Sequence, residues 1–97
     1  ARWRAQLQQA DALAQSGSWD SSAAALAESH ADWNKSQTYL HVVSQHSAVD
    51  EAEAMYRRCQ AFAAARELSE FQAELAGLRE QLRLLAEMEQ FSIRNIL

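Results

Sequence analysis

The chain has 97 residues and a formal net charge of −4, which is enough for one small domain, and its single cysteine excludes an internal disulfide. It contains no proline and two glycines, and Val, Ile and Thr are scarce, so a strand-rich fold is excluded. Nine basic residues stand against thirteen acidic ones and Lys35 is the only lysine, which argues against nucleic acid or an anionic membrane surface as a partner.

The first predicted helix covers residues 2–16, because apolar residues recur there at steps of three and four, which places them on one helix face. The residues of this face are Trp3, Leu7, Ala10 and Ala14. Gly17 follows and suits the left-handed conformation that often ends a helix.

The second predicted helix covers residues 19–44, with Ser18 as its N-cap. Its inward stripe advances in heptad steps. The stripe consists of Trp19, Ala23, Leu26, His30, Trp33, Gln37 and Leu40.

A third helix is predicted over residues 48–66, with a capping-box spacing from Ser47 to Asp50 and an i,i+4 pair between Glu53 and Arg57. Its inner side carries Val49, Ala52, Tyr56, Cys59, Phe62 and Ala63.

A fourth helix is predicted over residues 69–93, with a second capping box from Ser69 to Gln72. No Gly or Pro marks the break near residues 66–69, so one bent rod is the alternative to two helices. The fourth helix has an apolar seam of Phe71, Leu75, Leu78, Leu82 and Leu85, which Leu84, Met88 and Phe91 are expected to widen.

Together these segments predict an all-α fold: an antiparallel up-down helical bundle of three long helices plus a short N-terminal helix, forming a single domain over residues 1–97. The short connections favour antiparallel neighbours. Trp3, Trp19 and Trp33 fall on inward faces, where packing is expected and an aromatic groove for a partner helix or an apolar ligand is the alternative. Gly77 inside the last helix indicates a close helix crossing or self-association.

No catalytic, cofactor-binding or metal site is predicted. Glu-x-x-His, His-Glu-x-x-His, Cys-x-x-Cys and Gly-x-Ser-x-Gly are all absent, and the sequence has no glycine-rich loop, so an enzyme is not expected. His30 is expected at the core edge, bonded to a carboxylate or a carbonyl, with pH sensing as the alternative. Whether His30, His41, His46 or Cys59 binds anything stays open.

Several motifs resemble a family of small bacterial proteins, the domain-of-unknown-function family four-three-six-three. The resemblance covers about residues 17–97 and is most specific at the end of the chain. The motifs are Gly17–Ser18–Trp19 with Ala23, then Trp33, then His46 before Val49–Asp50, and the closing Glu89-x-x-Ser92-Ile93-x-Asn95-Ile96-Leu97. This sequence departs from the family at Ser18, where Asp is expected, and at Ser47–Ala48, where an acidic residue usually follows the His by two.

The resemblance implies a membrane-spanning segment upstream and an extracytoplasmic location, with the cytoplasm as the alternative. It supplies no known activity and no catalytic residues. Asn95 is interpreted as a C-terminal cap that folds Ile96 and Leu97 back onto the bundle.

The expected function is a non-enzymatic helical interaction module, the soluble part of a membrane-anchored bacterial protein. It would bind a protein partner or self-associate, without a cofactor, and would meet the membrane only through a segment outside these residues. The alternative is a small-ligand or metal-binding bundle, a sensor that uses His30, Cys59 and the Trp-lined interior.

Overall fold

The fold is an all-α bundle, as predicted, and it is seen in a computed structural model that describes residues 2–43 and 46–96, with side chains described for residues 3–35 and 47–88. Within these ranges the chain forms four helices and no strand. They are α1 (Arg2–Gln15), α2 (Trp19–Val43), α3 (His46–Ala64) and α4 (Leu68–Ile96).

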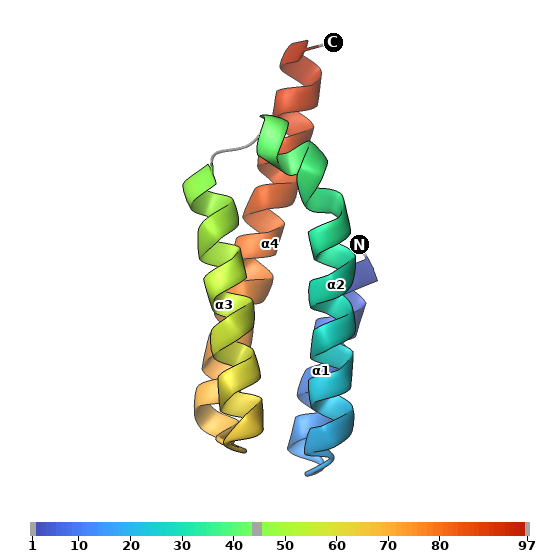
Figure 1. Cartoon of the computed structure of the whole chain (residues 1–97), viewed down its shortest axis with the longest axis vertical. Helices are drawn as coiled ribbons and strands as arrows, with labels where there is room; N and C mark the ends of the chain where they lie inside the picture. Colours follow the sequence, from blue (N-terminus) through green and yellow to red (C-terminus); the bar gives the residue numbers. More distant parts are fainter. Residues whose placement is uncertain (1, 44–45, 97) are drawn as a thin grey trace.

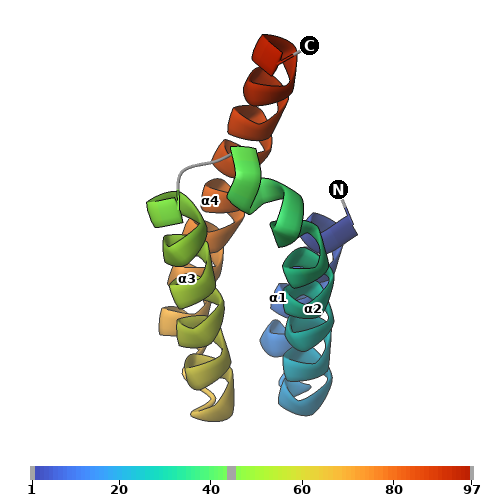
Figure 2. The same ribbon diagram turned by 45° about the horizontal axis from the view of Figure 1, so that its top comes forward.

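Each helix runs antiparallel to the next, so the chain forms two helical hairpins that pack side by side (Figure 1). The turns at residues 16–18 and 65–67 both lie at the lower end in Figure 1, with α2 and α3 in front of α1 and α4. The bundle measures 46 × 21 × 17 Å. At 29 residues, roughly 44 Å, α4 extends past the other helices and carries the C-terminus, as Figure 2 also shows.

The first hairpin turn ends α1 with a left-handed glycine. Gly17 has φ of 82° and donates its N–H to the Ala14 carbonyl at 3.0 Å, while Ser18 donates to the Leu13 carbonyl at 2.9 Å. This pair of bonds is a Schellman motif, which satisfies the carbonyls left open at the end of a helix.

The second hairpin turn repeats this geometry without a glycine. Arg66 has φ of 56°, its N–H donates to the Ala63 carbonyl at 3.1 Å, and Glu67 donates to the Phe62 carbonyl at 3.0 Å. Two separate helices therefore replace the bent-rod alternative. The break falls at residues 65–67, and because α4 begins at Leu68, Ser69 lies inside the helix instead of capping it.

The core runs along the axis where the hairpins meet. Most buried positions of the first hairpin have a buried counterpart in the second at the same separation along the chain, as Leu7 has in Tyr56 and Leu26 has in Leu75. Large side chains dominate α4, whereas small ones alternate with large ones in α1 and α2. The buried residues are Leu7, Ala10, Ala14, Ser22, Ala25, Leu26, Ser29, Trp33, Val49, Ala52, Tyr56, Cys59, Ala63, Phe71, Leu75, Leu78, Leu82 and Leu85.

The predicted inward stripe of α2 is wrong at Ala23, which is exposed, whereas Ser22 and Ser29 are fully buried. The reason is hydrogen bonding to α1: the Ser22 hydroxyl donates to the Ala10 carbonyl at 2.6 Å, and Ser29 donates to the Trp3 carbonyl at 3.2 Å. A satisfied hydroxyl is tolerated in a core, and two serines a heptad apart let α1 and α2 approach closely.

Two expectations for α4 are also corrected. Leu84 does not widen the buried seam, because its side chain is 40% exposed. The helix continues through Asn95 to Ile96, so a cap at Asn95 that turns the chain back is wrong. The side chains of Gln37, Leu40 and Phe91 lie outside the described residues.

Candidate functional site

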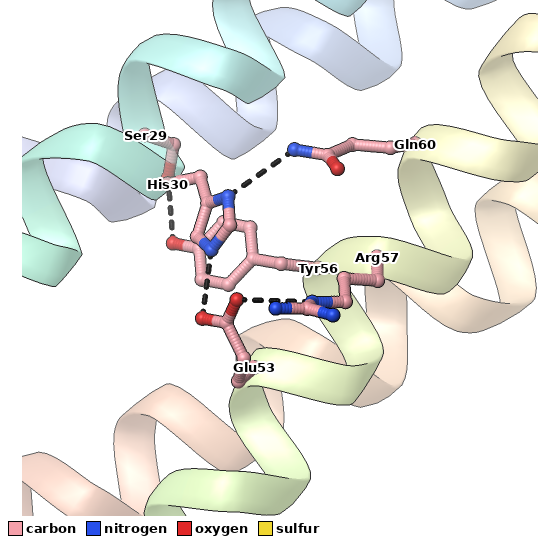
Figure 3. Close-up of polar contacts among 6 residues, drawn as sticks. All are labelled: Ser29, His30, Glu53, Tyr56, Arg57 and Gln60. Atoms are coloured by element: carbon pink, nitrogen blue, oxygen red, sulfur yellow. Dashed lines mark hydrogen bonds and ion pairs between the residues drawn. The ribbon is translucent and has the colours of Figure 1, made fainter.

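The candidate site is a polar cluster between α2 and α3, formed around His30 (Figure 3). Glu53, Tyr56, Arg57 and Gln60 lie at helical spacing on α3, so one face of that helix presents all four side chains. The adjoining face of α3 is apolar and buried, and His30 meets the cluster from α2.

Both ring nitrogens of His30 have partners on α3. Nε2 lies 2.8 Å from Glu53 Oε2, and Nδ1 lies 3.2 Å from Gln60 Nε2. Since the Gln60 amide donates to Nδ1, the proton of the neutral ring sits on Nε2 and points to Glu53, a tautomer assigned from its partners. The predicted hydrogen bond from His30 to a carboxylate is therefore confirmed, and the ring is 16% exposed.

Glu53 is shared between His30 and Arg57. Its second oxygen, Oε1, accepts from Arg57 Nε at 3.2 Å, which confirms the predicted i,i+4 pair. Burial raises the pKa of Glu53, but hydrogen bonds and charge from His30 and Arg57 outweigh burial, and the net pKa lies below its ordinary value of 4.5.

A second chain of hydrogen bonds lies deeper in the bundle. Ser29 gives its only proton to the Trp3 carbonyl, so the Tyr56 hydroxyl is the donor in the 2.8 Å contact with Ser29 Oγ. Burial raises the pKa of Tyr56 well above its ordinary value. These two hydrogen bonds join α1, α2 and α3, and they use the protons of both buried hydroxyls.

Aromatic side chains pack around these hydrogen-bonded hydroxyls. His30 stacks on Tyr56 with centroids 4.6 Å apart and planes 19° apart, and Trp33 lies 5.3 Å from Tyr56. Trp19 makes an edge contact with Phe71 at 5.4 Å. The tryptophans pack as predicted: Trp33 lies in the core, and Trp3 and Trp19 are partly buried and pack against it.

The cluster holds the helices in register but offers no free nucleophile. The Ser29 and Tyr56 hydroxyls are bonded to each other, and burial raises the pKa of the Cys59 thiol to about 12, so its thiolate is scarce. Among the described side chains, no three His, Cys, Asp or Glu residues gather closely enough to hold a metal ion. The side chains of His41 and His46 lie outside the described residues.

A second polar feature is an open groove of about 340 Å³ between α1 and α4, which we call the arginine groove. Its lining residues are Arg4, Ala76, Arg79, Glu80 and Arg83. Below it, Gln72 Nε2 donates to Asp11 Oδ1 at 3.1 Å and joins the same two helices. None of these lining residues stands out as a candidate in the sequence. The i,i+4 spacing of Arg79 and Arg83 in the sequence indicates two arginines on one face of a helix. Only the fold shows that Arg4 of α1 lies beside them.

Comparison with known proteins places the chain in a family and gives no further relative. No curated protein and no solved structure matches the chain significantly. None of the helices in the described ranges has the length and apolarity needed to cross a membrane. The family profile "Domain of unknown function" matches residues 2–96, which includes α1 as well as the part that carried the sequence motifs. The chain therefore belongs to the family Domain of unknown function (DUF4363).

Proposed function

We propose that this domain is a non-enzymatic helical interaction module that docks a partner protein at the arginine groove between α1 and α4. The observation that carries this proposal is the contrast between the two polar features of the bundle. The side chains around His30 bond to one another and join helices, whereas the arginine groove is open to solvent and lined by charged groups.

The alternative of a ligand or metal sensor in the interior is less well supported. A metal would need a free ring nitrogen of His30, and both nitrogens already have protein partners. Cys59 is fully buried, and burial raises its pKa, which disfavours the thiolate that binds metals.

The test is site-specific photocrosslinking in the native host. A benzophenone amino acid replaces Ala76 in the arginine groove or, as the control, Ala61 on the exposed side of α3. We expect a discrete protein adduct from position 76 and none from position 61. An adduct between two copies of the chain would identify self-association as the form of docking. Absence of any adduct from position 76 in a correctly folded variant would overturn the proposal.

The family resemblance also supports a location, and we propose that the native protein holds this domain at the extracytoplasmic face of the bacterial membrane through a segment outside these 97 residues. Fractionation of native cells followed by external protease tests this. Membrane-bound, protease-sensitive protein is the expected result, and protein that fractionates with the cytoplasm and resists protease would contradict the location.

A further inference from the structure

We propose that the arginine groove recognises an acidic segment of a partner protein, with carboxylates bound by Arg4 and Arg79. This inference rests on the interaction function proposed above, and it names the chemistry of the partner.

The charge near the arginine groove differs in sign from the charge of the whole chain. Three guanidinium groups and one carboxylate line the arginine groove, so it is positive in a chain whose net charge is −4. At physiological salt the Debye length is about 8 Å, so a bound segment senses these nearby arginines far more than the distant acidic residues. The local sign of charge therefore selects an anionic partner.

A carboxylate of the chain itself already binds an arginine in the groove. Glu80 binds Arg83 with two oxygens, through Nη2–Oε1 at 2.6 Å and Nε–Oε2 at 3.0 Å. This is the fork geometry in which a guanidinium holds a carboxylate. Hydrogen bonding to Arg83 lowers the pKa of Glu80, and the charge of Arg4 adds to the effect. Carboxylate is thus a ligand that these arginines accept.

The three arginines of the groove differ in how many of their hydrogen-bond donors are already used. Arg83 is held between Glu80 and Glu87, whose Oε1 lies 2.6 Å from Arg83 Nη1. Arg79, in contrast, makes no ion pair with any described side chain, and neither does Arg4 on the opposite wall. Both therefore keep guanidinium donors for an incoming carboxylate.

The shape of the arginine groove favours a peptide segment over a flat membrane. Arg79 and Arg83 are one turn apart on α4, about 6 Å along its axis. The cations therefore follow the groove instead of surrounding one point, and several carboxylates in a row fit them. The Ala76 methyl group lies among the arginines and suits the methylene groups of Glu side chains.

The binding test uses the full 97-residue chain and a fluorescein-labelled helical peptide with Glu at i,i+4 spacing. A peptide with Gln at those positions is the matched control ligand. The variant Arg4→Gln/Arg79→Gln removes the two unpaired arginines. Lys35→Gln/Arg66→Gln, exposed elsewhere, removes the same charge as the matched control. Thermal melting checks that both variants fold.

We expect the Glu peptide to bind the wild-type chain with a strong dependence on salt, and the Gln peptide to bind at least tenfold more weakly. The Arg4→Gln/Arg79→Gln variant should lose about tenfold in affinity for each arginine, as is typical of a charge-assisted hydrogen bond. The Lys35→Gln/Arg66→Gln variant should retain wild-type affinity. Equal loss in both variants, or no preference for Glu over Gln, would overturn the inference.

Two further experiments distinguish recognition of an acidic segment from membrane binding and from docking by other chemistry. Vesicles with and without phosphatidylserine test a membrane, and preferential binding to the anionic vesicles over the Glu peptide would overturn it. Photocrosslinking from Ala76 is repeated in cells that carry Arg4→Gln/Arg79→Gln. An undiminished adduct from the variant would support the interaction function but contradict the recognition of an acidic segment. Absence of an adduct from the chain with both arginines would contradict the interaction function itself.

Discussion

At the scale of single residues, alanine substitution at the two glycines should change the stability of the fold in opposite directions. Gly17 has φ of 82°, where an L side chain costs roughly 1–2 kcal/mol, so Gly17→Ala should lower the free energy of unfolding by about 1 kcal/mol. Gly77 lies inside α4, and a Cβ there would meet Met55 Cε at 3.5 Å, an ordinary contact. Gly77→Ala should therefore raise stability by up to about 1 kcal/mol.

Urea denaturation of the two alanine variants measures both effects against the wild-type chain. Destabilisation by Gly77→Ala would contradict this account, because it would mean that α3 and α4 are too close for a methyl group. The two helices would then lie closer together at Gly77 than the 3.5 Å distance to Met55 Cε indicates.

The Glu53–His30 contact predicts a specific pH dependence. The folded pKa of Glu53 lies below its ordinary value of 4.5, so the ionised group stabilises the fold above pH 4.5 and that contribution is lost as the pH falls through the folded pKa. Glu53→Gln should therefore destabilise the fold at pH 7 and approach the wild-type stability at lower pH. Urea titrations from pH 7 to below 4.5 check this, and a deficit independent of pH would contradict it.

At the scale of helices, the close approach of α1 and α2 depends on small residues, so a larger side chain at Ser22 should be poorly tolerated. Ser22→Leu removes the bond to the Ala10 carbonyl and overpacks the helix interface, which typically costs 1–3 kcal/mol, and we expect about that loss. Ser21→Leu, one residue away and exposed, is the matched control and should change little. Similar losses at both positions, measured by urea denaturation, would mean that packing against α1 is not the cause.

The end of α3 offers a stabilising change. Arg66 adopts the left-handed conformation that Gly17 adopts in the equivalent turn of the first hairpin. Arg66→Gly should relieve that strain and add up to about 1 kcal/mol of stability, less the greater freedom of glycine in the unfolded chain. Thermal unfolding measures the change, and a lower midpoint than wild type would contradict the interpretation of this turn.

At the scale of the whole molecule, Cys59 reports on the integrity of the bundle. The thiol is fully buried, and burial raises its pKa to about 12, so a thiol reagent at pH 8 should label it only after the bundle opens. As urea increases, labelling should rise together with the change in tryptophan fluorescence, because a small domain unfolds cooperatively. Labelling in native buffer as fast as in concentrated urea would contradict a closed bundle.

Periodicity in the sequence determined the helical class and much of the core. The buried residues predicted on α3 and α4, such as Tyr56, Cys59, Leu75 and Leu78, are buried in the structure. These helices repeat apolar residues in heptads next to charged ones, so only one face can turn inward. The sequence also predicted a carboxylate or carbonyl partner for His30, since a half-buried imidazole requires a hydrogen bond, and the structure shows the carboxylate of Glu53.

Only the tertiary structure decided which helix faces meet. Alanine and serine differ little in a helical pattern, so the burial of Ser22 in place of Ala23 depends on the carbonyls that α1 presents. The bond from His30 to Glu53 and the approach of Arg4 to Arg79 join distant parts of the chain. Such contacts depend on the rotation and axial shift of whole helices, which the packing of all side chains together decides and no local pattern encodes.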